Sequence, residues 1–286
     1  MIGLLMLASS ATAQVGPAIE YQRTDSVEVV QLLADDTRRT TLDYARYFLG
    51  RPYVAHTLDG AYASGGDGCE RLTVNLRGLD CLTLVETSSA LALSRRELEQ
   101  GGGDAWHIYC DHLQSLRYFD GHIDGYLSRM HYLTMSIADH LRRGDIEEVL
   151  LPETLTRKRT AKLHFMGRHP QAYDALKADA VLTKQLVALE QHYSGEEFRY
   201  LPQENCGLSR QQLSAIHDGD IIYIVTSKDG LDYSHQGFAF WGKDGKLHML
   251  HASSDRKRVI EDERPLATYL SRIPASIGIR VFRLKE

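Results

Sequence analysis

Apolar residues recur at helical spacing through the first half of the chain. Their positions predict a helix over about residues 80–100, which Gly101-Gly102-Gly103 ends. Asp104 then caps a second predicted helix, "DAWHIYCDHLQSLRY", whose apolar stripe contains Trp106, Tyr109, Cys110, Leu113 and Leu116. Shorter helices are predicted over about 36–48 and 136–143.

After Pro202 the period changes from that of a helix to that of a strand. Residues 220–225, 235–241 and 246–252 alternate in the manner of three strands of an antiparallel meander, and 276–282 adds another strand. Helices followed by strands predict an α+β fold with an antiparallel sheet packed on N-terminal helices.

Two further segments interrupt this pattern. A glycine-rich loop over 53–75 is long enough to be functional. Residues 144–205 are highly charged, include a predicted helix over about 173–192, and are expected to pack on the core as an accessory segment. We therefore predict one domain over 14–286.

The N-terminus, "MIGLLMLASSATA", is a short apolar stretch that ends in an Ala-x-Ala site. It indicates a signal peptide over 1–13 and a periplasmic or secreted protein, the alternative being a hydrophobic strand. No later segment has the ~18 apolar residues of a membrane span, so no integral membrane segment is expected in the mature chain.

Composition excludes some partners. The chain has 286 residues, 43% of them hydrophobic, with a net charge of -5 and no long basic run. Nucleic acid is therefore not an expected partner, and a monomer is predicted. The four cysteines form no C-x-x-C pair; an exported chain would permit a disulfide among Cys69, Cys110 and Cys206, with the pairing left open.

Cys81 stands at the start of the predicted 80–100 helix, in "GLDCLTLVE". Backbone N–H groups there would lower the pKa of its thiol and could hold an oxyanion. Cys81 is thus a candidate nucleophile, although a cysteine in a helix is more often a small packing residue.

A nucleophile needs a base, and His235 and His251 lie on neighbouring predicted strands. If Lys243-Asp244-Gly245 forms a three-residue loop with Gly245 left-handed, His251 falls opposite Gly237 and beside His235. A two-residue turn would shift the register and separate the histidines. In the first arrangement His235 is the base, His251 orients it, and Gly237 leaves room beside the ring.

Other residues carry weaker signals. His248 and His251 could suggest zinc, but at this spacing in a strand they point to opposite faces, so no metal or cofactor is predicted. Glu86 is expected to be a buried hydrogen-bond partner. The segment "GYLSRMHY" gathers Tyr126, Ser128, Arg129, His131 and Tyr132, which suit a sugar ligand; equally, Arg129 could pair with a buried carboxylate in a structural plug.

Taken together, "GRPY" at 50–53, "LDCLTLVE" at 79–86, "SHQGFA" at 234–239 and "LHASS" at 250–254 resemble the motifs of NlpC-type, papain-like cell-wall cysteine amidases. The segments "VNLRGLDC", "GHIDGYLSRMHY" and "HFMGRHP" resemble the N-acetylmuramoyl-L-alanine amidase-like branch of that superfamily. The resemblance extends over about residues 42–282.

This resemblance implies a papain-like core, catalytic Cys81, His235 and His251, and Tyr53 beside the nucleophile. It also implies peptidoglycan fragments as partners, cleaved at the amide between the lactyl group of a muramyl sugar and L-alanine. Anhydromuramyl disaccharide-peptides would be preferred. Asp80 and Leu82, which flank Cys81, are expected to contact the substrate.

Leu82 departs from the γ-D-glutamyl diamino-acid endopeptidases of the superfamily, which commonly carry serine at this position. It also departs from the threonine usual in the amidase branch, which leaves its contacts open. Three alternatives to the amidase are such an endopeptidase, a non-catalytic muropeptide-binding module and a zinc-dependent amidase.

Overall fold

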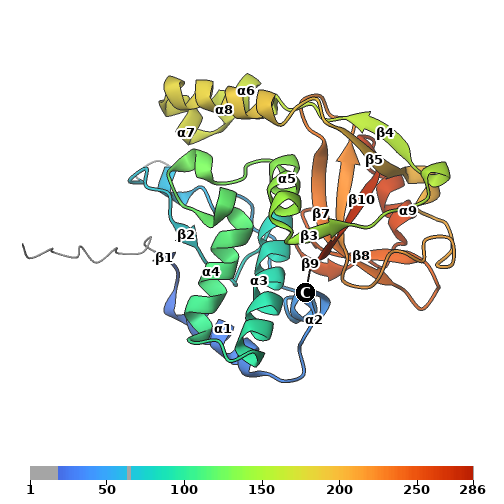
Figure 1. Cartoon of the computed structure of the whole chain (residues 1–286), viewed down its shortest axis with the longest axis horizontal. Helices are drawn as coiled ribbons and strands as arrows, with labels where there is room; N and C mark the ends of the chain where they lie inside the picture. The colour runs from blue at the N-terminus through green and yellow to red at the C-terminus, as the bar shows by residue number, and fades with distance from the viewer. Residues whose placement is uncertain (1–18, 63–65, 286) are drawn as a thin grey trace, which may run out of the picture.

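Helices from the first half of the chain cover one face of an eight-stranded sheet built from the second half (Figure 1). The computed structural model describes residues 19–62 and 66–285, so the predicted signal peptide lies outside the described residues. The mixed α+β class expected from the sequence is confirmed.

The helical layer contains the predicted elements with some shifted bounds. Its helices are α1 Arg23–Ala34, α2 Thr41–Tyr47, α3 Cys81–Glu99, α4 Ala105–Arg117 and α5 Leu133–Arg143. The helices predicted over 80–100 and after Asp104 are confirmed. The helix predicted from residue 36 begins only at Thr41, because the Thr40 side chain caps it by accepting from the backbone N–H of Asp43. Helix α1 was not predicted.

Strands from both the accessory segment and the C-terminal half form the sheet, in the order β4-β5-β10-β6-β7-β8-β9, with β3 also paired to β10. Their bounds are β3 Ile146–Glu148, β4 Arg157–Thr160, β5 Glu197–Pro202, β6 Ile221–Thr226, β7 Tyr233–Trp241, β8 Leu247–Ser253, β9 Arg258–Glu261 and β10 Ser276–Leu284. The predicted meander β6-β7-β8 is confirmed. A separate parallel pair joins β1 Ile19–Glu20 and β2 Leu72–Thr73.

Each face of the sheet has its own core. On β6, Ile221, Tyr223 and Val225 belong to the cluster shared with the N-terminal helices, whereas Ile222 and Ile224 face the opposite cluster. That second cluster is covered by α9 Leu266–Ser271. Because both faces are buried, β6 is apolar along its whole length rather than alternating.

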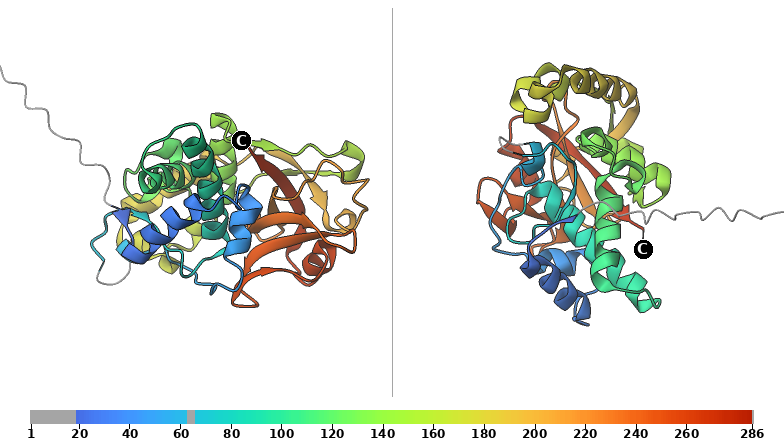
Figure 2. Two further views of the ribbon diagram at one scale, coloured as in Figure 1. Left: turned by 90° about the horizontal axis from the view of Figure 1, so that it is seen from below. Right: turned by 90° about the vertical axis from the view of Figure 1, so that its left-hand side faces the viewer.

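The accessory segment does more than pack on the core, since β3, β4 and β5 extend the sheet itself. Its remaining helices, α6 Phe165–Arg168, α7 Asp174–Ala178 and α8 Ala180–His192, lie together beyond the end of the α3–α5 layer (Figures 1 and 2). The single helix predicted over 173–192 is divided at Asp179, whose carboxylate caps α8.

The described residues bear on two expectations from the sequence, one on membrane spans and one on disulfides. Within them, no helix combines the length and apolar character needed to cross a membrane. All four cysteines are free thiols: Cys69 is exposed, whereas Cys110 and Cys206 are buried in different core clusters. The disulfide that export would permit is therefore not formed.

Candidate active site

Cys81 is the first residue of α3, and Asp80 before it is the N-cap. The Asp80 carboxylate accepts from the Thr83 backbone N–H at 2.8 Å, and the Asp80 N–H donates to the Thr83 hydroxyl at 2.9 Å. This capping box fixes the first turn of the helix. Cys81 itself is only partly buried, so its thiol is held at a rigid helix end within reach of a ligand.

A short extended segment places Tyr53 beside this helix start. The Tyr53 N–H donates to the Lys257 carbonyl at 2.9 Å, and the Leu79 N–H donates to the Pro52 carbonyl at 3.0 Å. Burial raises the pKa of the Tyr53 phenol to about 12, and the charges of Cys81 and Asp80 act in the same direction. Tyr53 therefore lies next to the thiol, as the sequence resemblance implied.

The two histidines meet because the hairpin adopts the first of the two loop geometries that the sequence left open. Gly245 has a φ of +70°, and the Gly242 N–H donates to the Lys246 carbonyl at 2.9 Å, which defines a three-residue loop. The pairing of Phe238 with Leu250 follows from this register. His235 Nε2 and His251 Nδ1 are 2.6 Å apart, close enough to share a hydrogen bond.

Strand β7 also approaches Cys81. The backbone N–H of Gln236, the residue after His235, lies near the Cys81 sulfur and opposes the rise in its pKa. Since Nε2 of His235 is occupied by His251, its remaining ring nitrogen is Nδ1. The His235–His251 pair and the thiol are therefore brought to the same part of the molecule from α3, β7 and β8.

The protonation chemistry differs from the sequence-based prediction. Burial raises the pKa of the Cys81 thiol to about 12, and the Asp80 carboxylate adds to the rise. The N–H groups of Cys81 and Leu82 lower the pKa as predicted, but they do not outweigh desolvation. Burial, aided by His251, lowers the pKa of His235 to about 3. The resting pair is thus a neutral thiol and a neutral imidazole, and the predicted low thiol pKa is wrong.

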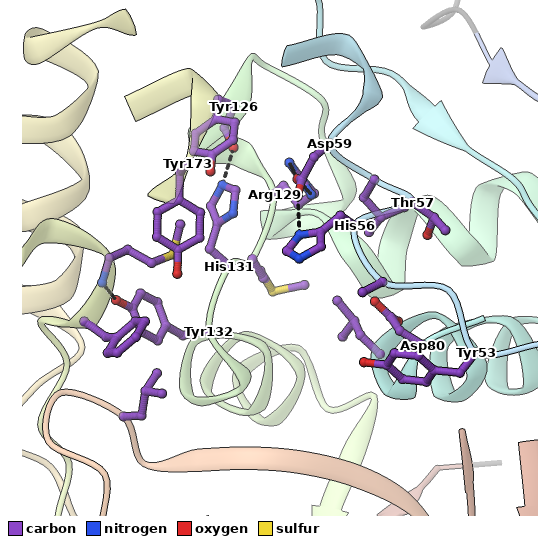
Figure 3. A pocket seen from close by; sticks show the side chains of 17 residues that line it. Tyr53, His56, Thr57, Asp59, Asp80, Tyr126, Arg129, His131, Tyr132 and Tyr173 are labelled. Carbon is purple, nitrogen blue, oxygen red and sulfur yellow. Dashed lines mark hydrogen bonds and ion pairs between the residues drawn. The ribbon is translucent and has the colours of Figure 1, made fainter. Parts of the chain in front are cut away.

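A cavity of about 370 Å³ begins at the start of α3 and extends toward the accessory helices (Figure 3). The segment before α3 and the start of that helix contribute Tyr53, His56, Asp59, Asp80 and Leu82 to its lining, and later segments contribute Tyr126, Arg129, His131, Tyr132 and Tyr173. Seven of the eight substrate-binding residues predicted from the sequence line this cavity. The exception is Ser128, which is not among the lining residues; its hydroxyl donates to the Gly125 carbonyl at 2.7 Å.

His131 offers the cavity an unprotonated nitrogen. Its Nε2 lies 2.8 Å from the Tyr126 carbonyl, which can only accept, so this nitrogen carries the proton. Burial, together with the nearby Arg129 guanidinium, lowers the pKa of His131 to about 3. Nδ1 is therefore an acceptor for a hydroxyl or amide N–H. Tyr132, by contrast, uses its hydroxyl internally, where it donates to Glu190 and accepts from the Met166 N–H.

Arg129 forms ion pairs with carboxylates. This is the structural role that the sequence offered as the alternative to a sugar contact. Its guanidinium lies 3.1 Å from Glu70 and 3.1 Å from Asp59, and both Arg129 and Glu70 are buried. Burial raises the pKa of Glu70, with Arg129 opposing the rise. Glu86 is likewise a buried partner, since it accepts from Arg117 at 2.7 Å. Arg129 therefore closes the floor of the cavity rather than presenting a free cation to it.

A second cavity of about 340 Å³ adjoins the first and shares His56, Asp59, Tyr126 and Tyr173 with it. Its remaining lining includes Tyr62, whose ring contacts that of Tyr126 edge to face at a centroid distance of 4.9 Å. Together the cavities form an elongated, aromatic-lined space that starts at Asp80 and Leu82, the residues on either side of Cys81. Cys81, His235 and His251 are not among the lining residues of either cavity.

The zinc-dependent alternative would need a cluster of metal ligands. In the described part of the chain, no group of three or more His, Cys, Asp or Glu side chains is placed so that it could hold a metal ion. His248 has both ring nitrogens engaged, with the Asp262 carbonyl and the Asp244 carboxylate.

Three residues near the histidines were missed in the sequence. Tyr269 on α9 stacks edge to face on His251 at 5.1 Å, and Arg264 lies over the Tyr269 ring. Asp262 lies 3.6 Å from His251 Nε2. They belong to a charged turn and a short helix that show no periodic signal.

Comparison with known proteins identifies the family. A family model described as N-acetylmuramoyl-L-alanine amidase-like matches residues 43–279, most of the chain. The protein therefore belongs to the N-acetylmuramoyl-L-alanine amidase-like family. A search of curated proteins gave no match.

Several solved structures are similar to this chain. An N-acetylmuramoyl-L-alanine amidase from Bacteroides uniformis is 36% identical with a TM-score of 0.76, over 86% of this chain and 99% of its own. A Bacteroides fragilis protein described as a candidate xylanase is also 36% identical, with a TM-score of 0.75 over 85% of this chain and 100% of its own. A Legionella pneumophila protein at 20% identity shares the fold, with a TM-score of 0.67 over 92% of this chain and 95% of its own.

Proposed function

We propose that this protein is a cysteine-dependent peptidoglycan amidase. It hydrolyses the amide between the lactyl group of N-acetylmuramic acid, preferably the anhydro form, and L-alanine of the stem peptide. Its core is that of the NlpC-type, papain-like enzymes, and it acts in the periplasm or outside the cell. The observation that carries the proposal is the 2.6 Å contact between His235 Nε2 and His251 Nδ1. His235 lies on β7, and the backbone N–H of the next residue on that strand, Gln236, lies near the Cys81 sulfur.

The reaction begins from the neutral pair. As the Cys81 sulfur attacks the lactyl carbonyl carbon, its proton passes to Nδ1 of His235, and the first N–H groups of α3 bind the oxyanion. His235 then gives the proton to the departing alanine nitrogen as the C–N bond breaks, which leaves a thioester. Water, deprotonated by His235, attacks the thioester and releases the lactyl carboxylate and the free thiol.

The cavity suits the sugar side of this substrate. Tyr126 and Tyr173 offer aromatic faces, His131 offers an acceptor, and Leu82 supplies an apolar contact beside the thiol. The two adjoining cavities provide space for a disaccharide. A glycosidase would need a pair of free carboxylates across the bond. Of the acidic residues that line the two cavities, Asp59 is held by Arg129 and Asp80 caps α3, which leaves Asp174 without a second free carboxylate.

Cysteine dependence is tested with defined muropeptides and three proteins. Cys81→Ala should abolish hydrolysis, whereas the control Cys69→Ala, which removes the exposed loop cysteine, should keep it. A chelator should leave the wild-type rate unchanged. Full activity of Cys81→Ala would reject the proposal, and loss of activity on chelation would favour the zinc-dependent alternative.

A further inference from the structure

Asp262 follows β9, and its backbone is hydrogen-bonded to residues of β8, the strand that carries His251. Its backbone N–H donates to the Met249 carbonyl at 3.0 Å, and its carbonyl accepts from His248 Nδ1 at 2.9 Å. Its side chain is only 4% exposed and directs Oδ2 to within 3.6 Å of His251 Nε2. His251 is fully buried, and its Nε2 has no hydrogen-bond partner among the described residues. Among the described residues, this carboxylate is therefore the one acidic group placed against His251 Nε2.

Arg264 keeps this carboxylate charged and oriented. Its Nε donates to Asp262 Oδ1 at 2.8 Å, its backbone N–H donates to the same oxygen at 3.0 Å, and a second guanidinium nitrogen donates to Oδ2. Burial alone would raise the pKa of Asp262, but the hydrogen bonds from Arg264 and then the nearby His251 ring hold it well below its usual range. Asp262 is thus an ionised acceptor that cannot donate.

The contact between the histidines allows two proton arrangements. In the first, His235 Nε2–H donates to His251 Nδ1, so His251 carries its proton on Nε2 and His235 Nδ1 is free to accept from a thiol. In the second, His251 Nδ1–H donates to His235 Nε2, so His235 carries its proton on Nδ1 and cannot act as a base. The second arrangement also turns the lone pair of His251 Nε2 toward an anionic carboxylate.

We propose that Asp262 is a positioning residue that selects the first arrangement and so sets the tautomers of both histidines. The inference rests on the proposed function, because the selected tautomer matters only if His235 is the base. Asp262 attracts a proton to Nε2 of His251, which leaves Nδ1 to accept from His235. A catalytic hydrogen bond that is slightly long in the unliganded protein can shorten when substrate is bound.

Replacing the Asp262 carboxylate by an amide should change kcat in a way that a simple loss of packing would not. In Asp262→Asn the side-chain N–H can donate to His251 Nε2, which favours the second arrangement and disables the base. In Asp262→Ala neither arrangement is favoured. We expect kcat to fall on the order of 10³-fold or more for Asp262→Asn, compared with about 10⁴-fold when a triad carboxylate becomes an amide, with KM nearly unchanged. The fall for Asp262→Ala should be smaller.

The control is Asp244→Asn, which changes a half-exposed carboxylate that contacts His248 on the same hairpin. It should retain wild-type kcat. Equal losses for Asp262→Asn and Asp262→Ala, or a larger loss for Asp262→Ala, would overturn the proposal.

The tautomers can also be read without activity, by two-bond ¹H–¹⁵N spectra of the resting wild-type protein. The inference predicts that His235 and His251 both carry the proton on Nε2. A proton on Nδ1 of His251 would overturn it even if the variants fail to fold. This result is independent of the Cys81→Ala assay, whose failure would instead reject the proposed function.

Discussion

Gly237 on β7 lies opposite His251 on β8, and the two backbones are too close there to admit a side chain. A Cβ at residue 237 would lie 2.9 Å from the His251 Cβ and 2.6 Å from the Leu250 carbonyl oxygen. Real Cβ atoms do not approach so closely, so a larger residue must shift β8 and the His251 ring. The His251 ring can therefore keep its position only if residue 237 is glycine, as the space predicted beside the ring implied.

Replacement of Gly237 by alanine should misplace His251 more than it unfolds the protein. We expect kcat to fall about 10²-fold, since a displacement of about 1 Å in catalytic geometry has effects of this size. Steady-state kinetics and thermal unfolding of Gly237→Ala should be measured beside Gly103→Ala, where no atom of the described residues lies within 4 Å of the added methyl. Wild-type kcat in Gly237→Ala would show that the strand spacing is not needed.

The pH dependence should reflect a histidine that stays neutral in mild acid. A base acts in its unprotonated form, and the lowered pKa of His235, about 3, keeps it unprotonated far below pH 6.5. We therefore expect kcat/KM at pH 5 to lie within about threefold of its value at pH 7, with an acidic limb only at lower pH. A pH profile on a defined muropeptide checks this. An acidic limb centred near pH 6.5 would contradict it.

The Arg129 ion pair should matter more for stability than an exposed pair of the same kind. Arg129→Met leaves the buried Glu70 without its cation, which should cost about 3–5 kcal/mol in the free energy of unfolding. Arg157→Met removes the exposed pair with Glu204 and should cost less than about 1 kcal/mol. Urea unfolding of both variants provides the measurement. A loss of under 1 kcal/mol for Arg129→Met would mean that the guanidinium is not a structural plug.

Tyr173 lines both cavities and should contribute to recognition of a second sugar. Tyr173→Ala should raise KM by up to about tenfold for a disaccharide-peptide, because an aromatic contact worth about 0.5–1.5 kcal/mol is lost. The change for the matching muramyl-peptide without the second sugar should be smaller. If both substrates lose affinity equally, the second cavity does not receive a sugar.

Local signals explain which parts of the structure could be predicted. The capping box at Asp80 acts over a few residues, so the start of α3 follows from the sequence. The turn residues around Gly245 narrow the histidine register to two possibilities, and the fold selects one of them. Partners such as Glu70 and Asp262 come from distant, aperiodic segments, and nothing nearby indicates what they will meet.

Competing effects explain two other differences. The helix end lowers the thiol pKa of Cys81 as predicted, but burial has the larger effect, and burial depends on the whole fold. Strands β3 to β5 were missed because they are short and include the charged run "RKRT" at β4, the edge of the sheet. Polar residues are suited to such an edge and hide the alternation of a strand.

The bond that is cleaved tests the central claim most directly. The purified protein should be incubated with an anhydromuramyl disaccharide-tetrapeptide and the products identified by mass spectrometry, with Cys81→Ala in parallel. The account predicts free disaccharide and intact tetrapeptide from the wild type and neither from the variant. Cleavage within the peptide would contradict it in favour of an endopeptidase, and no cleavage under reducing conditions would favour a muropeptide-binding module.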